Sequence, residues 1–156
     1  AGAGSIAQCI NAMLEKEGIN ISVNALIEGG ETPKSILNNT MKDMQVLDLT
    51  GCNIEEVLYY VSCGSPVFSM TGSTDAVLII GYDSNSVVIF DPALGTTYRK
   101  TLTEADEMFT AAGNVFFTYL VKMKVHKKAL KVGNYSCKFN RFHVLLLQIG
   151  NRWVIF

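Results

Sequence analysis

The sequence lacks any apolar run long enough to cross a membrane. A membrane-spanning helix needs roughly 18 or more consecutive apolar residues, and the run near the end, Val144–Leu147, falls far short of that. Charged residues are also scarce, at 17% of the 156 residues against 49% hydrophobic ones. This balance excludes intrinsic disorder and predicts one domain with a buried core. No internal repeat and no proline-rich linker divides the chain.

Metal-binding patterns are missing as well. None of the four cysteines, Cys9, Cys52, Cys63 and Cys137, stands in a CxxC pair or beside histidines at zinc-site spacing. We therefore predict no metal and no cofactor. One disulfide stays open, although buried free thiols are favoured in so apolar a chain.

Acidic residues are absent after Glu107. Up to that point there are 14 acidic and five basic residues, a net charge of −9, whereas the remainder carries eight Lys or Arg and a charge of +8. The favoured interpretation is that both parts neutralise each other within one fold. Two others stay open: a basic tail that contacts an anionic partner, and a tail foreign to the domain. Nucleic acid is not expected as a partner, because the tail lacks regularly spaced basic and aromatic residues.

Helices are predicted from apolar spacing and capping residues. Ser5 is expected to cap the first helix, and Thr32-Pro33, Asn53 with Glu56, and Thr103 with Asp106 are expected to open later ones. The predicted helices are Ile6–Glu17, Ser22–Ile27, Thr32–Met41, Asn53–Cys63 and Thr103–Ala112.

Strands are predicted mainly after the first helices, so the class is α+β rather than an alternating βαβ pattern. The runs Ala76–Gly81 and Val87–Asp91 are expected to form a hairpin that brings Asp75 and Asp91 together at its open end. We assign residues 1–125 to one domain and 126–156 to a basic C-terminal segment with possible extra strands. The other predicted strands are Gln45–Leu49, Val67–Met70, Thr96–Lys100, Asn114–Val125 and, in the last segment, Tyr135–Ile149 and Trp153–Phe156.

Three side chains are candidates for chemistry, each with a structural alternative. Cys9 is expected in or near the first helical turn, where free N–H groups and the helix dipole favour a thiolate, or else it is a buried packing residue. Asp91 before Pro92 either belongs to a site or only forms a turn, and Asp75 either belongs to a site or caps its loop. A cation held by these three is disfavoured, because the ligands are of mixed hardness and include no histidine.

Three stretches of the chain resemble the bacteriocin-processing (double-glycine leader) peptidases, which belong to the papain-like cysteine peptidases. The resemblance rests on Leu58 through Gly64-Ser-Pro-Val, on Ala-Val-Leu-Ile-Ile-Gly-Tyr-Asp at 76–83, and on Val-Val-Ile-Phe-Asp-Pro at 87–92. In that family a cysteine opens the first long helix, a histidine begins the strand matching 76–81, and an aspartate before proline ends the next strand. The resemblance covers about residues 5–120 and implies a papain-like fold, with N-terminal helices packed on a mostly antiparallel sheet.

The resemblance implies site positions at Cys9, Asp75 and Asp91, with Asp75 where the family has its histidine. Gln8 is the candidate oxyanion neighbour, although the family places that glutamine several residues before the cysteine, and Ala3 stands six residues before Cys9. Proton transfer from a thiol with a pKa of about 8.5 to a carboxylate of about 3.9 costs about 6 kcal/mol. A carboxylate there also raises the pKa of the thiol.

Two functions follow from the resemblance. The favoured one is a catalytically degenerate relative that binds a peptide or protein segment, or serves as a structural module of a larger bacterial protein. That larger protein is expected to be secreted or to belong to the cell envelope. The alternative is an active cysteine peptidase with Cys9 as nucleophile and its base supplied by His126 or His143. Because the chain does not begin with Met, it is expected to be part of a longer protein. Its oligomeric state and its location stay open.

Overall fold

The computed structural model describes residues 4–121, 136–139, 145–149 and 152–155. The chain divides into two units, Ala1–Lys122 and Met123–Phe156, and each is described by itself. Both histidines lie outside the described residues, as does the predicted continuation of the last strand to Val125.

The first unit has five helices and six strands among its described residues. The helices are α1 (Ser5–Lys16), α2 (Val23–Glu28), α3 (Pro33–Thr40), α4 (Ile54–Ser62) and α5 (Leu102–Ala111). The strands are β1 (Met44–Asp48), β2 (Val67–Met70), β3 (Ala76–Tyr82), β4 (Ser86–Asp91), β5 (Thr96–Thr101) and β6 (Phe116–Val121).

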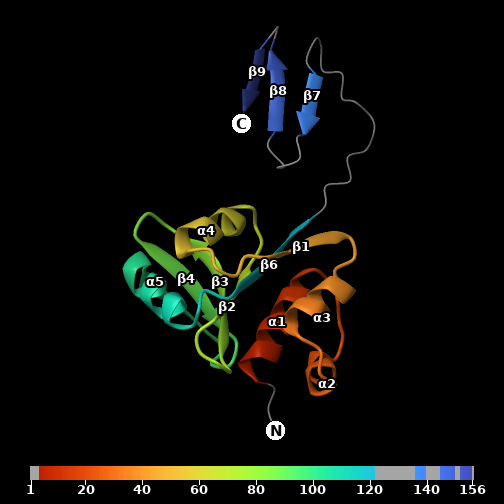
Figure 1. Cartoon of the computed structure of the whole chain (residues 1–156), viewed down its shortest axis with the longest axis vertical. Coiled ribbons are helices and arrows are strands. Elements are labelled where there is room, and N and C mark those ends of the chain that lie inside the picture. Colours follow the sequence, from red (N-terminus) through yellow and green to blue (C-terminus); the bar gives the residue numbers. More distant parts are fainter. Residues whose placement is uncertain (1–3, 122–135, 140–144, 150–151, 156) are drawn as a thin grey trace. The chain divides into compact units, whose positions relative to one another are not determined.

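The six strands form one sheet in the order β1-β6-β2-β3-β4-β5, and every neighbouring pair is antiparallel. The sheet lies between two groups of helices, α1 to α3 on one side and α4 with α5 on the other (Figure 1). We call these two sides the α1–α3 face and the α4–α5 face. The arrangement confirms the predicted α+β class with N-terminal helices on an antiparallel sheet.

Each face has its own hydrophobic core, as alternation along the strands requires. On β3, Ala76 and Leu78 pack toward the α1–α3 face, whereas Val77 and Ile79 pack toward the α4–α5 face. Burial on both faces explains why the strand is apolar throughout and does not alternate with polar residues.

The capping patterns predicted the starts of two helices correctly. Thr32 and Ser35 form a reciprocal capping box at α3, and Asn53 and Glu56 form another at α4. For α5 the prediction was wrong, since the capping residue is Thr101 with Glu104 instead of Thr103 with Asp106. Because β5 extends to Thr101 and the helix begins at the next residue, the end of the strand is itself the cap.

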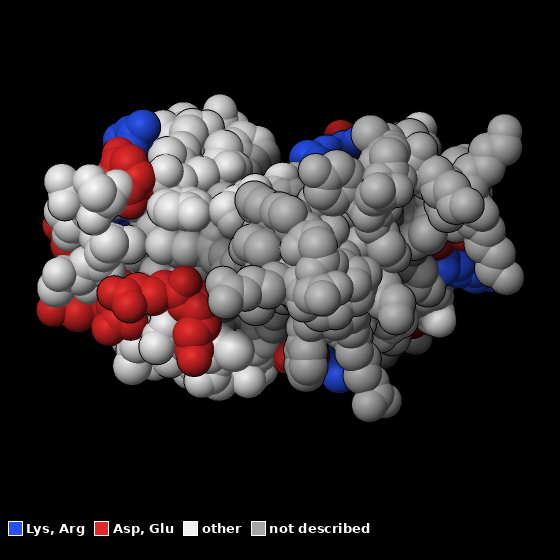
Figure 2. Space-filling model, turned by 90° about the horizontal axis from the view of Figure 1, so that it is seen from above, with Lys and Arg blue, Asp and Glu red and all other residues white. Residues whose placement is uncertain are grey.

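Figure 2 shows a group of acidic side chains on the side of the first unit on which α4 and α5 lie in Figure 1. Glu55 and Glu56 occupy the first turn of α4, and Glu104 occupies the first turn of α5. Carboxylates near a helix N-terminus interact favourably with its dipole. Part of the acidic excess in the first unit therefore stabilises these helices locally.

The predicted hairpin forms between β3 and β4, with Leu78 opposite Phe90 and Ile79 opposite Ile89. An irregularity in the pairing lies between Ile79 and Gly81. The pairing of the two strands ends with Leu78 opposite Phe90. Asp75 and Asp91 both lie beyond this last pair, at the open end of the hairpin.

The second unit contains a three-stranded antiparallel sheet in the order β7-β8-β9. Its strands are β7 (Ser136–Phe139), β8 (Leu145–Ile149) and β9 (Arg152–Ile155). The predicted run Tyr135–Ile149 contains two of these strands, and the predicted Trp153–Phe156 overlaps the third. Whether this segment and the first unit form one domain stays a prediction. No helix among the described residues is long and apolar enough to span a membrane.

Candidate active-site remnant

The helix α1 opens at Ser5. Its N-cap is Gly4, in extended conformation and without a side-chain cap, so the prediction that Ser5 caps the helix was wrong. The Ser5 hydroxyl instead donates a hydrogen bond to Asp75 Oδ1 at 3.4 Å and accepts one from the Ala76 N–H at 3.1 Å. These bonds join the first residue of α1 to the first residue of β3 and the aspartate before it. Ser5 is only 8% exposed.

Asp75 is held at the end of a short loop before β3. Its backbone carbonyl accepts a hydrogen bond from the Thr71 N–H at 2.9 Å, and its Oδ2 accepts one from the Thr74 hydroxyl at 3.3 Å. The side chain is exposed. Asp75 therefore closes its loop, as the structural alternative predicts, and also contacts the opening of α1.

Asp91 ends β4 and forms a turn. Its Oδ1 accepts hydrogen bonds from the backbone N–H groups of Ala93 at 3.0 Å and Leu94 at 3.3 Å. Its charge also acts on nearby groups: burial raises the pKa of Tyr98, and the Asp91 charge raises it further. Asp91 thus forms the turn and also raises the pKa of Tyr98.

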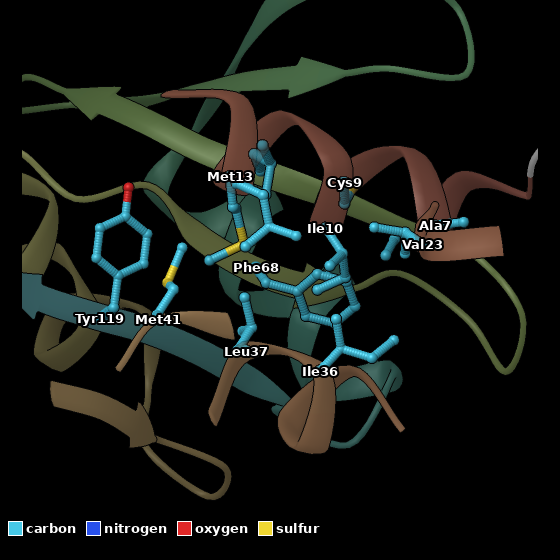
Figure 3. Packing of buried hydrophobic residues seen from close by; sticks show 13 residues of the cluster. Ala7, Cys9, Ile10, Met13, Val23, Ile36, Leu37, Met41, Phe68 and Tyr119 are labelled. Carbon is cyan, nitrogen blue, oxygen red and sulfur yellow. The ribbon is translucent and has the colours of Figure 1, made fainter. Parts of the chain in front are cut away.

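Cys9 lies inside the hydrophobic core of the α1–α3 face. It is the fifth residue of α1, fully buried, and Figure 3 shows it on the helix that also carries Ala7, Ile10 and Met13. Burial raises the pKa of the Cys9 thiol to about 12, and the Asp91 charge contributes in the same direction. The expected raising of this pKa by a neighbouring carboxylate is therefore present, but burial is the larger cause.

The position of Cys9 along the helix explains why the helix N-terminus does not lower the pKa of this thiol. Only the first N–H groups of a helix lack partners within it. In α1 the N–H of Gln8 already donates to the Gly4 carbonyl at 3.1 Å. Since the free N–H groups end before Cys9, they do not offset the cost of burying a thiolate.

Gln8 is half-buried, and its Oε1 is buried without a hydrogen-bond partner among the described residues. Gln8 is three residues after Ser5, about one turn further along α1. A buried amide oxygen without a donor is uncommon in folded proteins. The structure thus leaves an acceptor unsatisfied in the first turns of α1.

Two surface hollows are found elsewhere in the first unit. An apolar one of about 390 Å³ is lined chiefly by α2 and α3, including Ile21, Leu26 and Ile36. A polar one of about 410 Å³ lies between the starts of α4 and α5, including Glu55 and Asp106. Neither is lined by Ser5, Asp75 or Asp91. Within the described residues no group of three His, Cys, Asp or Glu side chains could hold a metal ion.

The sequence pattern indicates Ser5 only as a helix cap, because Ser is a common N-cap residue. It does not indicate the contact of Ser5 with Asp75. The available signal was Gly4, which can itself take the extended N-cap conformation and leave Ser5 as the first helical residue. The contact with Asp75 spans 70 residues of sequence and has no local pattern.

Comparisons with known proteins identify the fold. No protein-family model and no curated protein matches the sequence. Among solved structures, a crystal structure from Bacillus anthracis assigned to the C39-like peptidases matches with a TM-score of 0.65 and 18% sequence identity. The match covers 75% of this chain and 88% of that one. The chain thus has the fold of a C39-like peptidase, which fits the predicted papain-like architecture.

Proposed function

We propose that the first unit is a catalytically inactive relative of the C39-like peptidases that binds a peptide segment at the opening of α1. The observation that carries this proposal is the hydrogen bond between Ser5 and Asp75. In the family that the sequence resembles, a cysteine opens the first helix and a histidine begins the strand matching β3. Here Ser5 opens α1 and Asp75 directly precedes β3, so we assign the nucleophile position to Ser5 rather than Cys9.

This pair cannot carry out the chemistry of a cysteine peptidase. Such an enzyme needs a nucleophile activated by a base, and an acid that protonates the leaving amine. A serine hydroxyl gives up its proton less readily than a thiol, and aspartate as a residue type is a much weaker base than histidine. Aspartate also does not replace the protonated imidazole that gives a proton to the leaving amine. Both substitutions therefore act against hydrolysis.

The assignment is tested by restoring the missing groups. In a Cys9→Ser background, Ser5→Cys alone is compared with Ser5→Cys combined with Asp75→His, and iodoacetamide alkylation of the introduced thiol is followed against pH by mass spectrometry. We expect the single variant to show an apparent thiol pKa at or above about 8.5, because Asp75 is anionic. In the double variant it falls by several pKa units, because an imidazolium stabilises the thiolate.

Asp106→His serves as the matched control, since Asp106 lies on α5 and lines a different hollow. Combined with Ser5→Cys, it is expected to leave the thiol pKa unchanged. An equal pKa in the Asp75→His and Asp106→His variants would show that Ser5 and Asp75 are not the nucleophile and base positions. Hydrolysis of a peptide by the unaltered chain would contradict the proposed inactivity.

A further inference from the structure

One face of the sheet in the second unit consists almost wholly of apolar positions. The three strands pair in the order β7-β8-β9 and form a sheet distinct from the six-stranded one (Figure 1). Residues that stand opposite each other in antiparallel strands share a face, and so do alternate residues along one strand. Leu147 of β8 stands opposite both Cys137 of β7 and Val154 of β9. We call the face with these positions the apolar face of the second unit, and it consists of Cys137, Phe139, Leu145, Leu147, Ile149, Arg152 and Val154.

The opposite face of this sheet is mixed, since polar and apolar residues are equally frequent on it. It consists of Ser136, Lys138, Leu146, Gln148, Trp153 and Ile155. A sheet with one apolar face is stable when that face packs against another layer. Among the described residues of the second unit there is no helix that could form this layer. The described residues of this unit therefore do not themselves cover the apolar face.

The charge of the second unit has one sign only. Eight Lys or Arg residues follow Glu107, and one of them, Lys122, belongs to the first unit, so the second unit carries seven. It contains no Asp or Glu. Two of the seven, Lys138 and Arg152, stand on the strands themselves. Whatever covers the apolar face must therefore accept a strongly positive unit as well as apolar residues.

An anionic lipid bilayer offers both properties. Its headgroups give the surface a negative potential, which attracts each Lys or Arg close to it. Directly beneath the headgroups lies an apolar layer, in which the apolar face of an amphipathic element is buried. A second copy of this unit offers an apolar layer but repels the first through its equal charge. A nucleic acid attracts the charge through its phosphates but offers no apolar layer.

We propose that the second unit binds the surface of anionic lipid bilayers. Its apolar face lies at the boundary between headgroups and acyl chains, and its Lys and Arg residues lie among the headgroups. Binding of this kind attaches the chain to a membrane surface without a membrane-spanning helix. The inference goes beyond the proposed peptide binding and does not depend on it, because the Ser5–Asp75 contact belongs to the first unit.

The first test measures flotation of the full chain with two kinds of vesicle, phosphatidylcholine alone and phosphatidylcholine with an equal part of phosphatidylglycerol. We expect at least tenfold tighter binding to the anionic vesicles, and this preference should decrease as salt is raised. Lys138→Gln and Arg152→Gln should each weaken the binding about fivefold, because each removes one charge close to the surface. Lys100→Gln, on β5 of the first unit, is the matched control and should leave the binding unchanged.

The second test determines which face of the sheet enters the bilayer. Trp153 is the only tryptophan of the chain and belongs to the mixed face. Leu147→Trp in a Trp153→Phe background moves the single tryptophan to the apolar face. Lipids with brominated acyl chains quench the fluorescence of a nearby indole. They should quench the fluorescence of the Leu147→Trp variant at least twofold more strongly than that of the unaltered chain. Circular dichroism and thermal unfolding check that all variants are folded.

The outcomes are distinct. If the unaltered chain binds neither kind of vesicle, the inference is refuted, and light scattering that shows a dimer would then assign the cover to a second copy. Equal binding to both kinds of vesicle would show that anionic lipid is not required. Binding that Lys138→Gln and Arg152→Gln leave unchanged, or equal quenching of the two tryptophan positions, would overturn the placement of this sheet at the bilayer.

Discussion

The two faces of the sheet differ in how their helices begin. On the α4–α5 face, both helices start at capping boxes formed by residues within their own first turn. On the α1–α3 face only α3 begins at a capping box, whereas α1 and α2 begin without a side-chain cap. The opening of α1 is held by Asp75 and Ala76, from a different part of the chain. Where capping side chains already accept the first backbone N–H groups of a helix, few free hydrogen-bonding groups remain for a ligand. The opening of α1 instead depends on tertiary contacts, and the exposed Asp75 carboxylate lies beside it.

The two hydrophobic cores differ in residue type, because the core of the α1–α3 face also contains a thiol and a tyrosine ring. The core of the α4–α5 face consists of aliphatic and aromatic residues such as Val57, Ile89 and Phe109. The core of the α1–α3 face also buries the Cys9 thiol and the ring of Tyr119, whose hydroxyl donates to Glu17 Oε1 at 2.7 Å. We infer that the α4–α5 face provides stability, while the α1–α3 face combines stability with polar contacts at both ends of α1, Ser5 with Asp75 at its start and Glu17 with Tyr119 at its end.

The largest effect is expected from truncating the apolar core of the α4–α5 face. Phe109 in α5 is fully buried and contacts the ring of Phe116, with the ring centroids 5.5 Å apart. Phe109→Ala should lower the free energy of unfolding by about 3–5 kcal/mol, measured by urea denaturation. Glu107→Ala, at an exposed position of the same helix, is the control and should change it by less than about 0.5 kcal/mol.

The same variant tests the division of roles. If Phe109→Ala remains folded at low temperature, the Ser5–Asp75 contact should persist, because it involves only α1 and the start of β3. Loss of peptide binding in a folded Phe109→Ala protein would show that both faces contribute to the site, and the comparison between them would fail.

A smaller loss is expected from the polar contact between Tyr119 and Glu17. Tyr119→Phe keeps the ring and removes a hydrogen bond to a carboxylate, so it should lower the free energy of unfolding by about 1.5–3 kcal/mol. Burial, together with the hydrogen bond to Glu17 and the charge of that residue, raises the pKa of Tyr119 above its ordinary value of 10. This contribution is therefore complete below pH 10 and is lost as the pH rises above it.

Urea denaturation at several pH values checks this dependence. Tyr119→Phe should weaken the decline in stability above pH 10, and an unchanged decline would assign it to other groups. Tyr82→Phe is a suitable control, because Tyr82 is 44% exposed.

The start of α5 lies at Thr101 in the structure, whereas the sequence pattern favoured Thr103. Thr101→Ala removes the N-cap of α5 and should cost about 1 kcal/mol of unfolding free energy. Thr103→Ala, at the position favoured by the sequence pattern, should cost less than about 0.5 kcal/mol. Thermal or urea unfolding of the two variants decides which threonine is the cap, and an equal loss would contradict the observed geometry.

These threonines show what the sequence could and could not predict. Alternation, turn residues and capping boxes are local, so the β3–β4 hairpin and the starts of α3 and α4 were predicted to within one or two residues. The α5 cap was misplaced because β5 runs directly into the helix, and local patterns do not reveal where a strand ends. Both threonines have an acidic residue three positions later, so the pattern alone could not separate them.

The site was harder to predict than the fold, for a physical reason. The hairpin alone predicted that Asp75 and Asp91 lie at the same end of the strand pair, because antiparallel pairing fixes which strand ends meet. The contact of Asp75 with α1 depends on how that helix packs on the sheet. Cys9 was a candidate because thiols are reactive, yet its position on α1 directs its side chain into the hydrophobic core. Ser5 has an unremarkable side chain whose importance comes entirely from its tertiary neighbours.

The smallest effect is expected at Cys9, where two causes of a raised pKa can be separated. Burial is the larger cause and the charge of Asp91 the smaller. Asp91→Asn should therefore lower the thiol pKa only slightly and leave Cys9 unreactive toward iodoacetamide at pH 8 in the folded protein. The exposed thiol of Cys63 provides an internal reference for the alkylation, and unfolding in urea should make Cys9 react as well.

Rapid alkylation of Cys9 in the folded, unaltered chain would mean that the thiol is accessible and activated. An active cysteine peptidase with Cys9 as its nucleophile would then become the better hypothesis. Cys9 would belong to the functional site and not to the hydrophobic core of the α1–α3 face.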